Sequence, residues 1–176
     1  MPSDEALHRR LVQGDLSAFD QLYERYERPL FGFIRKHLSD PHEAEDVLHE
    51  TFLALLRQRS EARSVRSFKA WLYQVARNLC LNRHRSRKRA ASATKVMAQA
   101  PRRPEQEPDD RLLRRQAAQA LRAGVAKLPD SLAELYALRA GGLSYADIAD
   151  LLGIPLGTVK SQMHELISRL RQEMRT

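Results

Sequence analysis

The stretch "LSYADIADLLGIPLGTVKSQMHELISRL", residues 143–170, contains the signals of two short helices joined by a tight turn. Ser144 is a favourable N-cap residue, and Asp147, three positions later, would complete a capping box. Gly153 suits a left-handed turn after the first helix. Ala149 is small enough for the second helix to cross closely. This spacing is typical of a DNA-binding helix-turn-helix, with an ordinary helical hairpin as the alternative.

The second helix of this pair has an apolar face and a polar face. Its apolar residues recur at spacings of four, three and four, which places them on one side. On the opposite side, Lys160 and Arg171 can contact phosphates. Ser161 and His164 can reach base edges, and Glu165 can accept a hydrogen bond from cytosine N4. The predicted buried residues are Val159, Met163, Leu166 and Leu170, and the predicted DNA-binding residues are Thr158, Lys160, Ser161, His164, Glu165, Ser168 and Arg171.

Helical patterns also dominate the first half of the chain. Glycine is scarce, at 7 of 176 residues, and apolar residues recur at spacings of three and four without strand-like alternation. One helix is predicted from near Ser17 and another after Ser67. Between them, Asp40 is an N-cap candidate, followed by Pro41 and by Glu43, which would close a capping box. The predicted buried residues are Phe19, Leu22, Tyr23, Tyr26, Leu30, Phe33 and Ile34 on the first helix, Val47, Leu48, Phe52 and Leu55 on the second, and Phe68, Leu72, Val75 and Leu79 on the third.

The composition changes at residues 90–110, "AASATKVMAQAPRRPEQEPDD". This stretch has little apolar periodicity, and its three prolines fix φ and remove backbone donors. We predict that it is a flexible linker. Helical patterns resume at residues 112–127 and 132–139. The sequence therefore predicts an all-α fold with two small helical domains, at residues 1–89 and 111–176, joined by this linker.

The charge of the chain favours a polyanionic partner. Lysine and arginine total 30 against 22 acidic residues, for a formal net charge of +8, which suits nucleic acid or an anionic membrane. The single cysteine, Cys80, excludes an internal disulfide and fits a reducing compartment. The sequence has no signal-peptide pattern and no apolar run of bilayer length, so we expect a cytoplasmic protein that does not bind membranes.

The third predicted helix ends in a basic run, "WLYQVARNLCLNRHRSRKR", residues 71–89. Arginines attract the nucleic-acid backbone without reading its sequence. Trp71 offers a stacking surface, and the carboxamides of Gln74 and Asn78 can bond base edges once pairing is broken. This combination favours single-stranded or melting DNA. The alternatives are a half-buried core position for Trp71 and a solvated helix end for the arginines. The predicted DNA-binding residues are Trp71, Gln74, Asn78, Asn82, Arg83, Arg85, Arg87 and Lys88.

The second predicted helix is acidic over its first half. Glu43 lies where it complements the positive end of the helix dipole, but Asp46 and Glu50 lie beyond the first turn. An acidic and partly apolar surface on a basic chain favours a protein partner with a basic surface.

Five segments in one order resemble the extracytoplasmic-function sigma factors of bacterial RNA polymerase. They are "AFDQLYERYERPLFGFIRKHL", "DPHEAEDVLHETFLALL", "SFKAWLYQVARNLCLNRHR", "LPDSLAELYALR" and "GLSYADIADLLGIPLGTVKS". The resemblance covers nearly the whole chain outside the linker and the extreme ends. It implies a sigma-two helical bundle, followed by a sigma-four helix-turn-helix.

The resemblance also implies a function and partners. The chain would be an alternative sigma factor, and not an enzyme, that binds core RNA polymerase and helps to open the −10 element of specific promoters. Its acidic helix would dock on the clamp of the largest subunit, and it would also contact the flap of the second-largest. Asn78 would lie where the family captures an extruded base, and the final helix would read the −35 element. An anti-sigma factor is a further implied partner. The implied core contacts are Glu43, Asp46, Val47, Glu50 and Phe52.

The last helix departs from the family pattern at three usual arginine positions, which here are Gln162, Glu165 and Ile167. The turn between Arg139 and Leu143 is also about one residue shorter than is usual. We therefore expect weak contact with the −35 element and promoter choice that depends more on the −10 segment.

Two other functions remain open at this point. A stand-alone helix-turn-helix regulator would bind duplex operators without polymerase. The other is a metal or hydrolytic enzyme, for which His37, His42 and His49 are the candidate residues. The chain has neither an HExxH motif nor cysteine spacing of the zinc type, so we expect no metal and no cofactor. Cys80 lies beside the apolar stripe of its helix and is expected to pack in the core.

Overall fold

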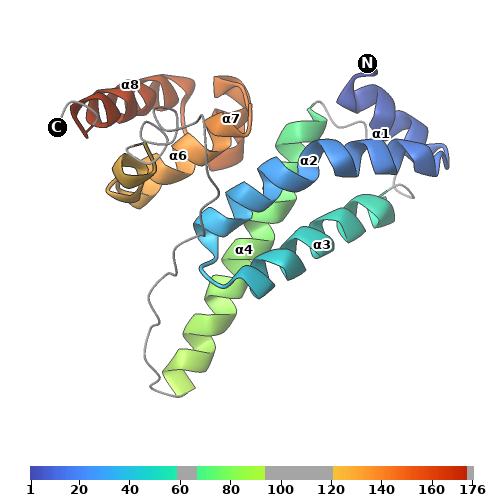
Figure 1. Ribbon diagram of the computed structural model, residues 1–176, viewed down its shortest axis with the longest axis horizontal. Helices are drawn as coiled ribbons and strands as arrows, with labels where there is room; N and C mark the ends of the chain where they lie inside the picture. Colours follow the sequence, from blue (N-terminus) through green and yellow to red (C-terminus); the bar gives the residue numbers. More distant parts are fainter. Residues whose placement is uncertain (59–66, 94–120, 174–176) are drawn as a thin grey trace, which may run out of the picture. The chain divides into compact units, whose positions relative to one another are not determined.

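The computed structural model describes residues 1–58, 67–93 and 121–173, and every regular element in these ranges is an α-helix (Figure 1). The predicted all-α fold is thereby confirmed. The chain divides into two compact units, Met1–Met97 and Ala98–Thr176. Most of the predicted linker lies outside the described residues. Residues 90–93, which we had assigned to the linker, instead continue the preceding helix.

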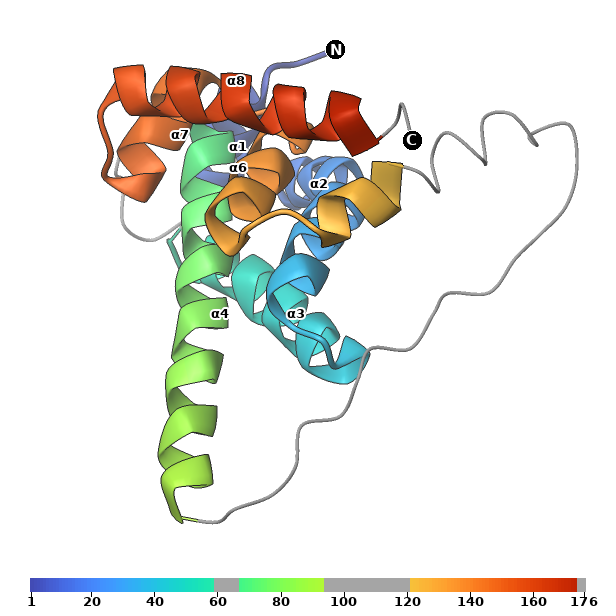
Figure 2. The same ribbon diagram turned by 90° about the vertical axis from the view of Figure 1, so that its left-hand side faces the viewer.

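The first unit contains α1 (Asp4–Val12), α2 (Leu16–His37), α3 (Pro41–Gln58) and α4 (Phe68–Ala93). α2 packs on both α3 and α4, which also contact each other, and α1 packs against α2 and α4. Figure 2 shows the C-terminal part of α4 extending past the other helices of this unit.

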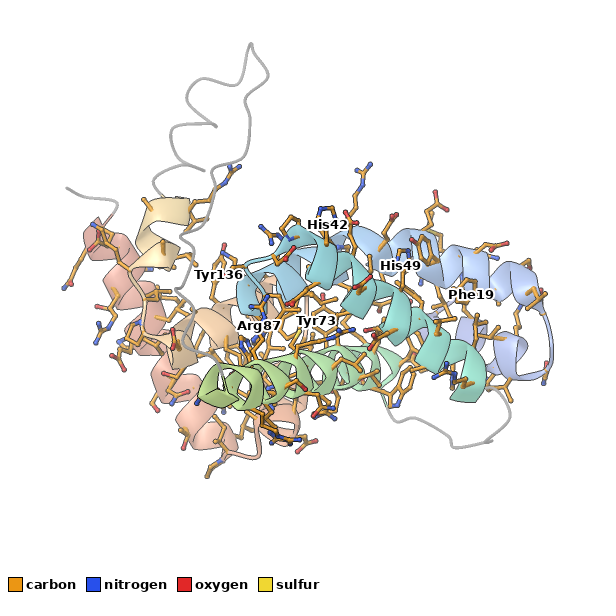
Figure 3. The ribbon with its side chains drawn as sticks, turned by 90° about the horizontal axis from the view of Figure 1, so that it is seen from below. Phe19, His42, His49, Tyr73, Arg87 and Tyr136 are labelled. Carbon is orange, nitrogen blue, oxygen red and sulfur yellow. The ribbon has the colours of Figure 1, made fainter. Side chains whose placement is uncertain are left out.

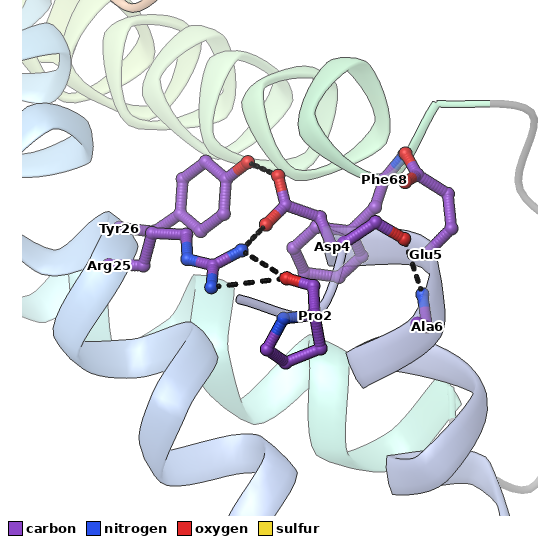
Figure 4. Close-up of polar contacts among 8 residues, drawn as sticks. Pro2, Asp4, Glu5, Ala6, Arg25, Tyr26 and Phe68 are labelled. Carbon is purple, nitrogen blue, oxygen red and sulfur yellow. Dashed lines mark hydrogen bonds and ion pairs between the residues drawn. The ribbon is translucent and has the colours of Figure 1, made fainter.

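Helix α1 was not predicted, although its signals are local. Ser3 caps the helix by accepting a hydrogen bond from the backbone N–H of Ala6 at 3.2 Å. Asp4 pairs with Arg25 and accepts a hydrogen bond from the hydroxyl of Tyr26, so that α1 is bound to α2 (Figure 4). The buried side chains of α1 are Leu7, His8 and Leu11.

The buried face of α4 differs from the prediction. Leu72 is buried as expected, but Val75 and Leu79 are only half-buried. Tyr73 takes the interior position and packs against Phe33, with ring centroids 5.1 Å apart. Tyr73 is the largest fully buried side chain in the described residues, and burying an aromatic ring removes more apolar area from water than burying valine. The buried residues of α4 are Phe68, Leu72, Tyr73, Ala76 and Cys80.

Cys80 is fully buried, as predicted, and burial raises the pKa of its thiol to about 12. Because alkylating agents react with the thiolate, the native protein at pH 8 is expected to react with iodoacetamide at least about 100-fold more slowly than the chain in urea. Mass spectrometry of the alkylated fraction over time measures both rates. Equal rates would mean that the core around Cys80 opens readily.

The second unit contains α6 (Asp130–Ala140), α7 (Tyr145–Leu152) and α8 (Leu156–Glu173), and residues 121–126 are also helical. The predicted capping box is present: Asp147 N–H donates to Ser144 Oγ at 3.1 Å, and Ser144 N–H donates to Asp147 Oδ2 at 3.2 Å. Gly153 ends α7 with φ of 67°, the left-handed conformation that glycine adopts without strain. The predicted core of α8 is confirmed: Val159, Met163, Leu166 and Leu170 are buried.

Candidate DNA-binding and protein-binding surfaces

Five of the predicted DNA-binding side chains lie along one side of α4. At 100° per residue, positions 71, 74, 78, 82 and 85 fall within about 80° of one another around the helix axis. Asn78, Asn82 and Arg85 are exposed. Gln74 Nε2 donates a hydrogen bond to Asn78 Oδ1 at 3.1 Å, which orients both carboxamides. We call this row the outer stripe of α4, composed of Trp71, Gln74, Asn78, Asn82 and Arg85.

Trp71, at the start of the outer stripe, packs against α1. Its ring lies 6.3 Å from that of His8 and 6.1 Å from that of Phe68, between centroids. His8 is 6% exposed. Because Trp71 is only half-buried, one side of the indole packs on the core and part of it remains open. Our sequence analysis overlooked His8, although the Leu7–Leu11 spacing indicates an apolar face on α1 beside it.

Burial lowers the pKa of His8 below its ordinary value, against the opposing effect of the Glu5 carboxylate. Because the folded state disfavours the imidazolium, the unfolded chain binds this proton at a higher pH. The contribution of His8 to stability is thus complete above about pH 6.5 and is lost as the pH falls below it, by at most about 1.4 kcal/mol per pH unit. Urea unfolding at pH 7.5 and 5.5, followed by Trp71 fluorescence, measures the loss. We expect His8→Phe to lose less stability than the wild type over this interval, and equal losses would contradict this assignment.

The arginines of α4 do not form a single surface. Arg83 and Arg87 lie on the side of α4 that faces α3, where Arg83 pairs with Glu50 and Arg87 pairs with Glu43. Arg87 is labelled in Figure 3. Nε of Arg87 donates a hydrogen bond to Oε1 of Glu43 at 3.2 Å, and the closest approach of the ion pair is 2.6 Å, between Nη2 and Oε2. These two predicted DNA-binding arginines therefore lie on a different side of α4 from the residues that begin the basic run, Trp71, Gln74 and Asn78. Lys88 is exposed.

The acidic residues of α3 likewise lie on two different sides of their helix. Glu43 was expected to close a capping box with Asp40, but its carboxylate turns to Arg87, and Asp40 Oδ1 accepts from the N–H of His42 at 2.9 Å. Val47 and Phe52 are 0% and 3% exposed, so neither is available as a surface contact, contrary to our expectation. We call the exposed side the outer face of α3; Figure 3 labels two of its members, His42 and His49. The outer face consists of His42, Glu45, Asp46, His49 and Leu53.

Six of the seven predicted DNA-binding residues of α8 are exposed. Thr158 is half-buried, and its carbonyl accepts a hydrogen bond from the hydroxyl of Ser161 at 3.0 Å. Glu165 forms an ion pair with Arg169 at 2.8 Å, one turn further along. This pair balances the carboxylate that would otherwise repel phosphate, and Arg169 is a residue that sequence reasoning missed. The exposed predicted residues are Lys160, Ser161, His164, Glu165, Ser168 and Arg171.

The described ranges contain neither a metal-binding cluster nor a membrane-spanning helix. Across residues 1–58, 67–93 and 121–173, no group of three or more His, Cys, Asp or Glu side chains could hold a metal ion. In the same part of the chain, no helix combines the length and the apolar composition needed to span a membrane.

Known proteins resemble the chain in both units. Residues 22–90 match the family described as Sigma-70 region 2, and residues 118–170 match the family described as Sigma-70, region 4. RNA polymerase sigma-H factor of Pseudomonas aeruginosa is 31% identical over 91% of this chain and 88% of its own length. ECF RNA polymerase sigma-E factor of Haemophilus influenzae is 29% identical over 92% of this chain and 89% of its own.

Solved structures share the fold. Sigma factor RpoE from Bartonella quintana, in its complex with anti-sigma factor NepR, matches with a TM-score of 0.69 and 24% identity, covering 90% of this chain and 97% of that one. CnrH, in its complex with the cytosolic domain of CnrY, matches with a TM-score of 0.68 and 21% identity, covering 98% of this chain and 97% of that one.

Proposed function

The chain belongs to the extracytoplasmic-function group of the sigma-70 family and is an alternative sigma factor that acts with RNA polymerase, and we propose that it directs this enzyme to specific promoters by holding a melted −10 strand on α4. The observation that carries the proposal is the outer stripe, in which an aromatic ring and carboxamides lie in one row on α4 that leads to the basic C-terminal end of this helix. Because its work requires polymerase and DNA, we place it in the cytoplasm.

The chemistry of the outer stripe suits an unpaired strand. The open part of Trp71 provides a face on which a base can stack. Asn78 and Asn82 each present a donor and an acceptor, which can bond the edge of a base only when that edge has left its pair. Arg85 follows on the same side and can neutralise a phosphate. An intact duplex would present its phosphates here but not its base edges.

We propose that the outer face of α3 docks on the clamp of the largest polymerase subunit. Glu45 and Asp46 are both exposed there, and Leu53 is 47% exposed. A basic and partly apolar partner surface would complement this combination. The contact with the flap of the second-largest subunit and an anti-sigma partner are proposed from family membership.

The polar face of α8 is proposed to contact the −35 element, mainly through the DNA backbone. Lys160→Ala is expected to weaken duplex binding by the polymerase complex similarly for all −35 sequences and to reduce the salt slope by about one unit, because it removes one phosphate contact. Filter binding at several salt concentrations measures the slope. An unchanged slope would mean that Lys160 does not face the DNA.

The test of the function is transcription from a library. The purified chain is mixed with core polymerase and random promoter sequences, and the transcripts are sequenced. We expect start sites that share a −10 motif and that disappear without the chain. Shuffling the −35 sequence should reduce these transcripts only in part. Tight binding of duplex operators by the chain alone, without association with core polymerase, would overturn the proposal.

A further inference from the structure

Two ion pairs connect α3 to the basic end of α4. Glu43 pairs with Arg87, and Glu50 pairs with Arg83. The two glutamates lie seven residues apart on α3, and the two arginines lie four apart on α4, so the members of each set share one side of their helix. Because the residue nearer the start of α3 meets the residue nearer the end of α4, the two helices run antiparallel through this contact.

The ion pairs lie where apolar packing has ended. Among the residues of α4 whose side chains the structure describes, 68–89, Cys80 is the last that is fully buried, and none of residues 81–89 is buried. The helix nevertheless continues to Ala93, more than three turns further. An extension without a core contact would be free to bend or fray. The two ion pairs attach this extension of α4 to α3.

We infer that Glu43 and Glu50 are positioning residues for the DNA-binding helix: through Arg87 and Arg83 they hold the extension of α4 in line, so that Arg85 stays in register with Asn78 and Asn82. This inference rests on the proposed function of the outer stripe. It assigns the two glutamates a role different from the core-polymerase contact that the family resemblance implied. It also removes Arg83 and Arg87 from the strand-contacting set.

Three roles for these residues predict different results. If the glutamates position α4, then removing their charge weakens promoter opening and leaves core binding unchanged. If the arginines contact the strand, then removing their acidic partners releases them and strengthens opening. If the glutamates contact polymerase, then the loss appears in the affinity for core.

The experiment uses the full chain, core polymerase and a promoter with 2-aminopurine in its −10 element. The double variant Glu43→Gln with Glu50→Gln is compared with Asp20→Asn with Glu24→Gln, which removes the same two negative charges from exposed sites on α2. At saturating chain we expect the double glutamine variant to open the promoter about threefold to tenfold less than the wild type, in keeping with two partly exposed ion pairs. Its Kd for core should remain within about twofold of the wild-type value.

A charge exchange supplies the second test. Glu50→Arg combined with Arg83→Glu restores the pair with its ends reversed, and opening should recover at least half of the loss caused by Glu50→Arg alone. No recovery, a gain in opening by the double glutamine variant, or a loss confined to core affinity would each overturn the inference.

A measurement without polymerase or DNA separates this inference from the proposed function. Amide hydrogen exchange of residues 83–89 in the free chain should be faster in the double glutamine variant than in the wild type. In the variant that combines Glu50→Arg with Arg83→Glu, it should be slower than in the double glutamine variant. Unchanged exchange would overturn the positioning role. Failure of the wild-type chain to open any promoter would overturn the proposed function and leave the exchange result to decide the positioning role.

Discussion

Asp46→Arg is expected to weaken binding of the chain to core RNA polymerase by about 30- to 1000-fold, equivalent to about 2–4 kcal/mol. Asp46 is exposed on the outer face of α3, next to Glu45. The substitution puts a positive charge opposite the basic surface that we propose for the polymerase clamp, so an attraction becomes a repulsion. Titration of labelled core with the chain measures Kd directly.

The fold should tolerate this change. Val47 and Phe52, which hold α3 in the core, remain in place, and no described ion pair of the protein uses Asp46. Circular dichroism should therefore match that of the wild type. Asp20→Arg, at an exposed position on α2, carries the same change of charge and should bind core nearly normally. Equal weakening by both variants would show a general charge effect and not a docking site.

Asn78→Ala is expected to reduce opening of the −10 element by about 5- to 150-fold at saturating core complex. A side chain that bonds a base edge in two places contributes about 1–3 kcal/mol of discrimination. The side chain of Asn78 is exposed, and its described hydrogen bond is with Gln74 on the same helix. Its removal should therefore affect DNA without disturbing the core. Permanganate footprinting of unpaired thymines measures opening.

His84→Ala is the matched control for this variant. His84 is exposed on α4, about 120° around the helix from Asn78. It should open the promoter as the wild type does, and both variants should keep the wild-type affinity for core. Opening that is equal in Asn78→Ala and His84→Ala would exclude the outer stripe as the strand-holding surface.

Local signals in the sequence were sufficient to predict the helix-turn-helix. The capping box of Ser144 with Asp147 and the left-handed Gly153 depend on residues within a few positions of each other. The core of α8 follows from a regular apolar period. For the same reason, the exposed face of α8 could be predicted residue by residue. These features need no knowledge of which helix packs on which.

Contacts between distant residues could not be predicted in this way. Glu43 has the right position for a capping box, but Arg87, 44 residues later, takes its carboxylate. Tyr73 is buried in place of Val75, and its ring packs against Phe33 of another helix. The support of Trp71 by His8 depends on where α1 docks. In each case tertiary packing decided between two locally acceptable arrangements.

The burial of Cys80, the only cysteine, makes the surface of the chain free of native thiols. A cysteine introduced at Ser86 on α4 or at Ser131 on α6, both exposed, would therefore be the one site that accepts a maleimide dye under native conditions. Energy transfer between either dye and an acceptor on the promoter would then follow the arrival of each unit on the DNA separately.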